Sequence, residues 1–157
     1  MPSNSAMSGE PTPIERAIRC LLLAVLLVGI AGVSADLLLL DHVESATQRI
    51  PAIALALSIV TIVSHLIVRR RGTVRLLQVV FLSFIACGGL GAYFHYEGNS
   101  AFQLEIDPDL SQSELIWKAL RAKAPPALAP LAFVQLGLVG LVWSYRHPLL
   151  RRAVRSS

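Results

Sequence analysis

Four long runs of apolar residues, separated by short polar stretches, dominate the chain. A run of about 18 or more apolar residues can cross the ~30 Å hydrocarbon core of a bilayer as a helix. The runs predict membrane-spanning helices at residues 20–40, 50–68, 76–94 and 127–145. We therefore expect an all-α membrane protein, a bundle of four transmembrane helices with an additional short outer interfacial helix.

The polar ends and connections complete the expected organisation. Residues 1–13 are rich in small and polar side chains without an apolar period, which predicts a disordered tail. Residues 14–148 form the transmembrane domain, and residues 149–157 form a basic cytoplasmic tail. The connection at residues 69–75 is so short that the second and third helices should be antiparallel neighbours.

The longest polar stretch is the outer segment, residues 95–126. Within it, apolar and polar side chains alternate over residues 102–106, which predicts a short strand after a turn at residues 98–100. Ser111 and Glu114 have the spacing of a capping box, so a helix should follow and run to about residue 123. Its apolar stripe fits an interfacial helix on the outer membrane surface or, equally, a helix packed across the mouth of the bundle.

The predicted spans contain glycines and two glutamines, but no charged side chain near mid-depth. We expect Gln135, near the middle of the fourth span, to face another helix, because its amide would be costly against lipid. Gln78 lies inside the third span. Small residues let helix backbones approach closely, so the glycines predict tight packing within the bundle. These glycines are Gly29, Gly32, Gly88, Gly89, Gly91, Gly137 and Gly140.

Composition agrees with a membrane protein. Charged residues make up 15% of the chain, against about 25% in soluble domains. The formal net charge of +4 does not indicate nucleic acid, because the basic residues form short runs at helix ends. We therefore expect the lipid bilayer as a partner and no nucleic acid. Arginine greatly outnumbers lysine, which is typical of a GC-rich bacterial genome.

The positions of the basic residues predict the orientation. Cytoplasmic loops of membrane proteins hold an excess of Lys and Arg. With both termini inside, ten basic residues lie on the inner side and four on the outer side, whereas eight of the ten acidic residues lie outside. We expect a multi-pass protein of the cell inner (plasma) membrane with cytoplasmic N- and C-termini. The inner basic residues are Arg16, Arg19, Arg69, Arg70, Arg71, Arg75, Arg146, Arg151, Arg152 and Arg155.

The first span has an alternative interpretation. Arg16 and Arg19 precede an apolar stretch that ends with small residues at Val33 and Ala35, as at a signal-peptidase site. Cleavage there would remove residues 1–35 and leave three spans. The apolar run resumes immediately after Asp36, and the uncleaved stretch has the right length to span, so retention is favoured.

The outer ends of the first and third spans carry the only cluster of side chains that could support chemistry. Carboxylates and imidazoles there could bind a divalent metal or act as acid and base, if the two spans are neighbours. As axial haem ligands, both histidines lie too close to water. The alternative is a solvated acidic rim with histidines at headgroup level. We identify no catalytic residue and no cofactor; the candidate metal ligands are Asp41, His42, His95 and Glu97, with Asp36 and Glu44 nearby.

Several short motifs lie between residues 93 and 148. They are His95-Tyr96-Glu97-Gly98-Asn99, Glu114-Leu115-Ile116-Trp117-Lys118-Ala119-Leu120, Lys123-Ala124-Pro125, Ala127-Leu128-Ala129-Pro130, Gln135-Leu136-Gly137 and Tyr145-Arg146-His147-Pro148. In these motifs the stretch resembles a family of small uncharacterised bacterial membrane proteins. The resemblance covers about a third of the chain. It implies a four-span membrane protein and no activity.

Three functions remain open. The first is a non-enzymatic scaffold, accessory or assembly component that presents the acidic outer segment, residues 95–126, to a membrane or periplasmic protein. The second is a metal-binding or hydrolytic membrane enzyme that uses the outer histidines and carboxylates. The third is an oligomeric small-solute transporter, which the lack of an acidic relay at mid-depth argues against.

Overall fold

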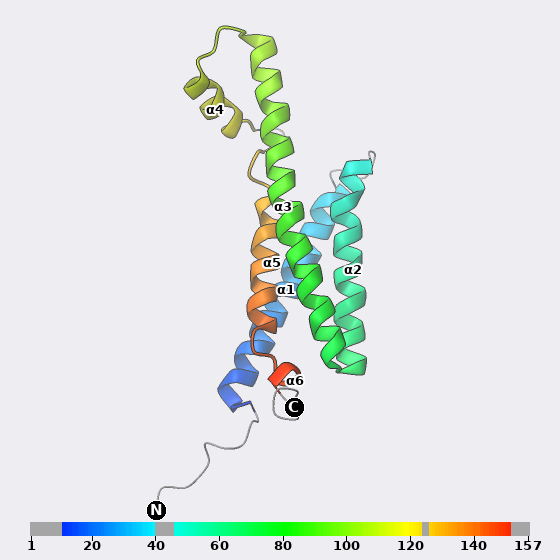
Figure 1. Ribbon diagram of the computed structural model, residues 1–157. Coiled ribbons are helices and arrows are strands. Elements are labelled where there is room, and N and C mark those ends of the chain that lie inside the picture. The colour runs from blue at the N-terminus through cyan, green and yellow to red at the C-terminus, as the bar shows by residue number, and fades with distance from the viewer. Residues whose placement is uncertain (1–10, 40–45, 124–125, 152–157) are drawn as a thin grey trace, which may run out of the picture.

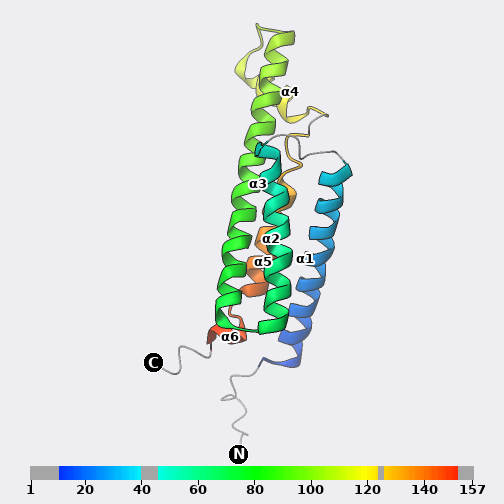
Figure 2. The same cartoon turned by 90° about the vertical axis from the view of Figure 1, so that its right-hand side faces the viewer.

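The computed structural model describes residues 11–39, 46–123 and 126–151, and every regular element in these ranges is a helix. The helices are α1 (Pro13–Leu39), α2 (Ala46–Val68), α3 (Arg71–Ile106), α4 (Gln112–Leu120), α5 (Leu131–Ser144) and α6 (Pro148–Arg151). Helices α1, α2, α3 and α5 lie side by side, and α3 extends far beyond the others (Figures 1 and 2). The predicted all-helical fold class is confirmed.

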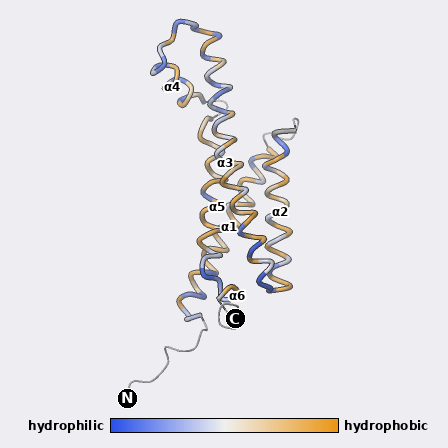
Figure 3. The backbone as a smooth tube through the Cα atoms, in the orientation of Figure 1, coloured by the Kyte–Doolittle hydropathy of each residue, from blue (hydrophilic) through white to orange (hydrophobic). Residues whose placement is uncertain are grey.

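Three helices are long and apolar enough to cross a membrane, namely α1, α3 and the part of α2 from Gln48. Many of their apolar side chains point outward; Val28 is 72% exposed and Ile67 77%. A surface of this kind suits lipid and not water. In Figure 3 hydrophobic colours prevail along α1, α2 and α5, whereas the turn between α2 and α3 is hydrophilic. These features favour a multi-pass membrane protein.

Helix α1 begins earlier than the apolar run alone predicts. The backbone N–H of Thr12 donates to Glu15 Oε2 at 2.9 Å, and the backbone N–H of Glu15 donates to Thr12 Oγ1 at 3.1 Å. This reciprocal pair is a capping box, and Pro13 at the first helical position has a backbone angle that suits a helix start. The helix therefore starts at Pro13, inside the stretch expected to be a disordered tail, of which residues 1–10 lie outside the described ranges.

A two-residue turn joins α2 to α3. Arg69 has a φ of 46°, in the left-handed region, and its backbone N–H donates to the His65 carbonyl at 2.9 Å. Arg70 is extended and forms the N-cap of α3. The turn reverses the chain, so that α2 and α3 pack against each other as antiparallel neighbours. The prediction from the short connection is confirmed.

The most extensive helix contact joins α3 and α5, and glycines make it possible. A Cβ at Gly137 would lie 2.6 Å from the Phe81 carbonyl oxygen, and a Cβ at Gly140 would overlap the Phe81 ring. Gly88 is equally crowded by residues of the α5 side, whereas a Cβ at Gly89 would meet open space. The glycine-based prediction of close packing is therefore confirmed at these α3–α5 contacts.

The helices form a bundle in which α1 packs on α5 and, less extensively, on α2. Within the described ranges the backbones of α1 and α3 do not approach each other closely. The core lies between the four helices. Its buried apolar residues are Leu26, Ile30, Ala54, Leu55, Ile62, Leu77, Val80, Phe81, Phe84, Phe133, Leu136 and Trp143.

The outer part of α3 departs from the sequence-based prediction. Residues 102–106 are not a strand and residues 98–100 are not a turn, because α3 continues through both to Ile106. Alternation over five residues does not distinguish a strand from an exposed helix that is apolar on several sides. Gly98 lies in helical backbone, and the helix ends only at Ile106. Asp107 is its extended C-cap and directly precedes Pro108, a residue that disfavours helical conformation in its predecessor.

Candidate functional site

His95 lies on α3, near the base of the outer segment. Its Nδ1 is 3.0 Å from the Pro126 carbonyl oxygen, and because a carbonyl can only accept, the ring donates this hydrogen bond. The residue is half-buried. The contact ties α3 to the stretch that leads into α5. Glu97, two residues further along, is exposed. In this geometry His95 has a structural role.

Within the described ranges, the structure brings no metal-binding cluster together. Asp41, His42 and Glu44 lie outside the described ranges, and Asp36 is exposed on α1, which is not a neighbour of α3. No group of three or more His, Cys, Asp or Glu side chains suited to a metal occurs in residues 11–39, 46–123 and 126–151. The metal-site hypothesis on His42 and Asp41 stays a prediction.

The outer segment is organised around the contact of α4 with α3. Leu115 and Ala119 of α4 are buried against α3, and the buried Asn99 donates from Nδ2 to the Ala119 carbonyl at 3.2 Å. This hydrogen bond holds the C-terminal half of α4 against α3. The sequence did not predict it, because residues 98–100 were expected to form a turn. In the described part of the chain α4 contacts no other helix, so it does not close the mouth of the bundle.

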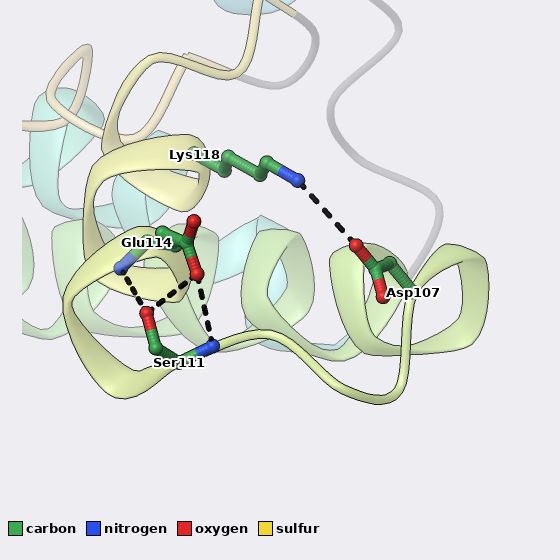
Figure 4. Close-up of polar contacts among 4 residues, drawn as sticks. All are labelled: Asp107, Ser111, Glu114 and Lys118. Atoms are coloured by element: carbon green, nitrogen blue, oxygen red, sulfur yellow. Dashed lines mark hydrogen bonds and ion pairs between the residues drawn. The ribbon is translucent and has the colours of Figure 1, made fainter.

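A capping box starts α4, as the sequence predicts (Figure 4). Ser111 Oγ accepts from the Glu114 backbone N–H at 3.4 Å, and Glu114 Oε2 accepts from the Ser111 backbone N–H at 3.2 Å. The hydroxyl of Ser111 and then its backbone N–H hold the pKa of Glu114 below its usual value. Lys118 Nζ lies 3.8 Å from Asp107 Oδ2, which links α4 to the end of α3.

The outer segment also exposes large apolar side chains. Trp117 is 62% exposed, Phe102 59% and Ile106 64%. The guanidinium carbon of Arg121 lies 5.5 Å from the centre of the Trp117 ring. Trp and Arg are two of the residue types enriched at the energetic centres of protein interfaces.

A second group of side chains lies at the opposite end of the bundle, where α2, α5 and the residues after α5 meet. The rings of His65, Trp143 and His147 are in mutual contact. The ring centroids of His65 and Trp143 are 5.5 Å apart, and those of the other two pairs are 5.3 Å apart. Thr73 Oγ1 donates to the Arg70 carbonyl, so it accepts from His65 Nδ1 at 2.8 Å. We refer to His65, Trp143 and His147 as the inner ring cluster.

His147 is neutral in this environment. Burial, followed by the nearby His65 and Arg19, lowers the pKa of His147 to about 4. Its Nδ1 accepts from the Leu149 backbone N–H at 3.3 Å, which also favours the neutral ring. The cluster therefore packs the start of the C-terminal stretch against the bundle.

Sequence reasoning missed the inner ring cluster. Trp143 lies in the last turn of α5, whereas His147 lies beyond its end, after Arg146 with a φ of 48°, so helical spacing does not relate the two side chains. His65 is distant in sequence and approaches them only through the order in which the helices pack. No local pattern could have joined it to the other two.

Comparisons with protein-family models, with curated proteins and with solved structures find no match to the chain. The resemblance of residues 93–148 to small bacterial four-span proteins therefore stays a prediction.

Proposed function

We propose that the protein is a non-enzymatic scaffold or assembly component of the bacterial inner membrane. In this proposal it crosses the membrane four times, with both termini in the cytoplasm. The outer segment then projects from the membrane and binds a membrane or periplasmic protein.

The length of α3 carries the proposal. Its 36 residues extend about 54 Å at 1.5 Å per residue, against a hydrocarbon core of ~30 Å. The excess of roughly 20 Å is the part that bears α4, and it contains the polar end of the helix (Figure 3). A single helix thus connects the membrane region rigidly to the outer segment, which suits presentation to a partner.

The fourth span needs a separate argument, because α5 has only 14 residues. Backbone N–H groups of Ala129, Leu131, Ala132 and Phe133 donate to carbonyls three residues earlier, which extends the coil back to Pro126. Five residues at about 2.0 Å and fourteen at about 1.5 Å give roughly 31 Å. Residues 126–144 can therefore cross the hydrocarbon core together.

The chemistry of the outer segment favours a protein partner. Trp117, Phe102 and Ile106 provide exposed apolar area, and the same segment, residues 95–126, carries five acidic and three basic residues. Apolar anchors within a charged rim are typical of protein interfaces. No observation within the described ranges favours the enzymatic or the transporter alternative.

Thiol labelling in intact cells tests the orientation. We expect an impermeant thiol reagent to label Ser113→Cys, in α4, and not Gly72→Cys, in the first turn of α3, both in a background with Cys20→Ser and Cys87→Ser. An epitope tag after Ser157 should stay protected from external protease. Protection of Ser113→Cys would exclude an outward-facing outer segment.

Photo-cross-linking tests the partner. A photoreactive amino acid at position 117 should capture another protein in intact membranes, whereas the same group at position 60 of α2, a 62% exposed site within a span, should not. Phe102→Ala combined with Ile106→Ala should weaken capture at position 117. If position 117 yields no protein adduct, the scaffold proposal fails.

A further inference from the structure

Gln135 lies on the outer surface of the bundle and not between helices, contrary to the expectation from its polarity. Its side chain is exposed, and no hydrogen bond to it is found within the described ranges. It lies within one residue of the centre of the predicted span at 127–145. An amide that faces hydrocarbon without a partner is costly, because lipid tails offer neither donor nor acceptor. A partner outside this monomer would remove that cost.

The residues around Gln135 form a continuous exposed stripe on α5. Leu131 is 40% exposed, Leu138 52% and Val142 59%, and these residues with Gln135 follow one another at intervals of four, three and four. The buried residues of α5 lie on the opposite side, toward α1 and α3. Intervals that alternate between four and three define the seam of a pair of supercoiled helices.

We propose that this stripe is an interface with a second copy of the chain, in which two α5 helices pack in parallel and their Gln135 side chains hydrogen-bond to each other. The inference rests on the proposed four-span arrangement, which places Gln135 at mid-membrane depth.

The chemistry of the stripe selects a second copy as the occupant. Two copies inserted in the same direction are related by a two-fold axis along the membrane normal, so identical residues meet at identical depth. An amide side chain carries both a donor and an acceptor, so two glutamines satisfy each other. In heptad terms Gln135 and Val142 occupy a positions and Leu131 and Leu138 occupy d positions. A β-branched residue and one polar residue at a, with Leu at d, favour a parallel pair in a fixed register.

The dimer also has a consequence for the outer segment. Helix α4 lies on the same side of α3 as α5 does, beyond the outer end of α5 (Figures 1 and 2). A two-fold axis beside α5 therefore brings the two outer segments next to each other. The partner-binding surface would be presented as a pair.

Disulfide cross-linking in native membranes tests the interface. In a chain with Cys20→Ser and Cys87→Ser, Leu138→Cys should form a covalent dimer under mild oxidation. Val60→Cys, at an equally lipid-facing position of α2, is the matched control and should stay monomeric. Equal yields at both positions, a covalent link from position 138 to a different protein, or no link would overturn the proposal.

Two further variants test the hydrogen bond itself. Gln135→Leu keeps the monomer core intact, because the side chain is exposed, and should weaken dimerisation about 5- to 30-fold. Gln135→Asn should retain most of the dimer. An unchanged dimer in Gln135→Leu would overturn the role of Gln135. The labelling pattern of Ser113→Cys and Gly72→Cys checks the span arrangement separately, so correct labelling without cross-linking refutes the dimer alone.

Discussion

Arg19, in the second turn of α1, donates a hydrogen bond from its guanidinium to the main-chain carbonyl of Tyr145, at the C-terminal end of α5, with a length of 2.9 Å. The same guanidinium also donates to the carbonyls of Trp143 and Arg146. The last carbonyls of a helix have no partner within the helix and lie at the negative end of its dipole. The first helix of the chain thus caps the last long one, and α1 is an integral part of the bundle.

Replacing Arg19 should therefore destabilise the whole bundle. We expect Arg19→Gln to lower the free energy of unfolding by about 1.5–3 kcal/mol, because hydrogen bonds from a charged donor are lost. Arg19→Lys should have a smaller effect, since it keeps the charge and loses the fork geometry. Thermal unfolding in mild detergent measures both. Arg16→Gln, an exposed change of equal charge in the same helix, is the control, and equal losses in the two variants would contradict the capping role.

The glycines at the α3–α5 contact should tolerate no added methyl group. In Gly137→Ala the new Cβ would meet the Phe81 backbone carbonyl, and in Gly140→Ala it would meet the Phe81 ring. Overpacking of this kind costs about 1–3 kcal/mol, since the helices must separate. The melting temperature of each purified variant in detergent measures the loss.

Gly89→Ala provides the control for these substitutions. It lies on the same pair of helices, but its Cβ would meet no atom within 4 Å. Alanine is favoured over glycine inside a helix by about 0.5–1 kcal/mol, so this variant should be as stable as the wild type or more stable. Destabilisation of Gly89→Ala by as much as Gly140→Ala would show that backbone effects, and not packing, govern all three sites.

The fold was predictable where local patterns decide it. The apolar runs located the long helices, and Ser111 with Glu114 located the start of α4 correctly. The pattern at residues 98–106 misled, because Gly98 and Asn99 resemble a turn while they continue α3, and Asn99 is held by the distant Ala119. The remaining contacts between helices depend on the order in which the helices pack, which no local pattern gives.

The candidate sites, too, were predictable only where they depend on residues close together in the sequence. Side chains on one helix, such as Leu131 and Leu138, can be related by their spacing, yet whether that stripe is buried depends on where α1 and α3 pack. Gln135 was expected between helices for a sound energetic reason, and the packing places it outside. The inner ring cluster depends on His65 meeting Trp143 across two helices.

Removing the N-cap of α4 should loosen the outer segment without affecting the bundle. Ser111→Ala deletes the oxygen that accepts from the Glu114 backbone N–H, and N-cap losses of this kind cost about 1 kcal/mol. We expect faster amide hydrogen exchange over residues 112–120 and unchanged exchange in α2. Gln112→Ala, one residue further along and exposed, should leave exchange in α4 unchanged. Slower exchange or a global loss of stability in Ser111→Ala would contradict a purely local cap.

The inner ring cluster should make stability depend on pH. The pKa of His147 is lowered to about 4 in the folded protein, whereas an unperturbed histidine has a pKa of about 6.5. The unfolded chain therefore binds a proton between these values that the folded protein does not bind. Stability consequently falls as the pH falls from about 6.5 toward 4 and changes no further below that range.

Replacing His147 should reduce this dependence. At pH 5 the free energy of unfolding of the wild type should be about 1 kcal/mol lower because of His147. This figure allows for solvent screening of the half-exposed ring. His147→Gln cannot titrate, so its loss of stability between pH 7.5 and pH 5 should be smaller than that of the wild type by this amount. Thermal unfolding of both proteins at the two pH values gives the comparison, and it cancels any constant packing cost of the substitution. Parallel losses in the two proteins would mean that His147 accepts a proton as readily when folded as when unfolded, and that the rings of His65 and Trp143 leave it open to water.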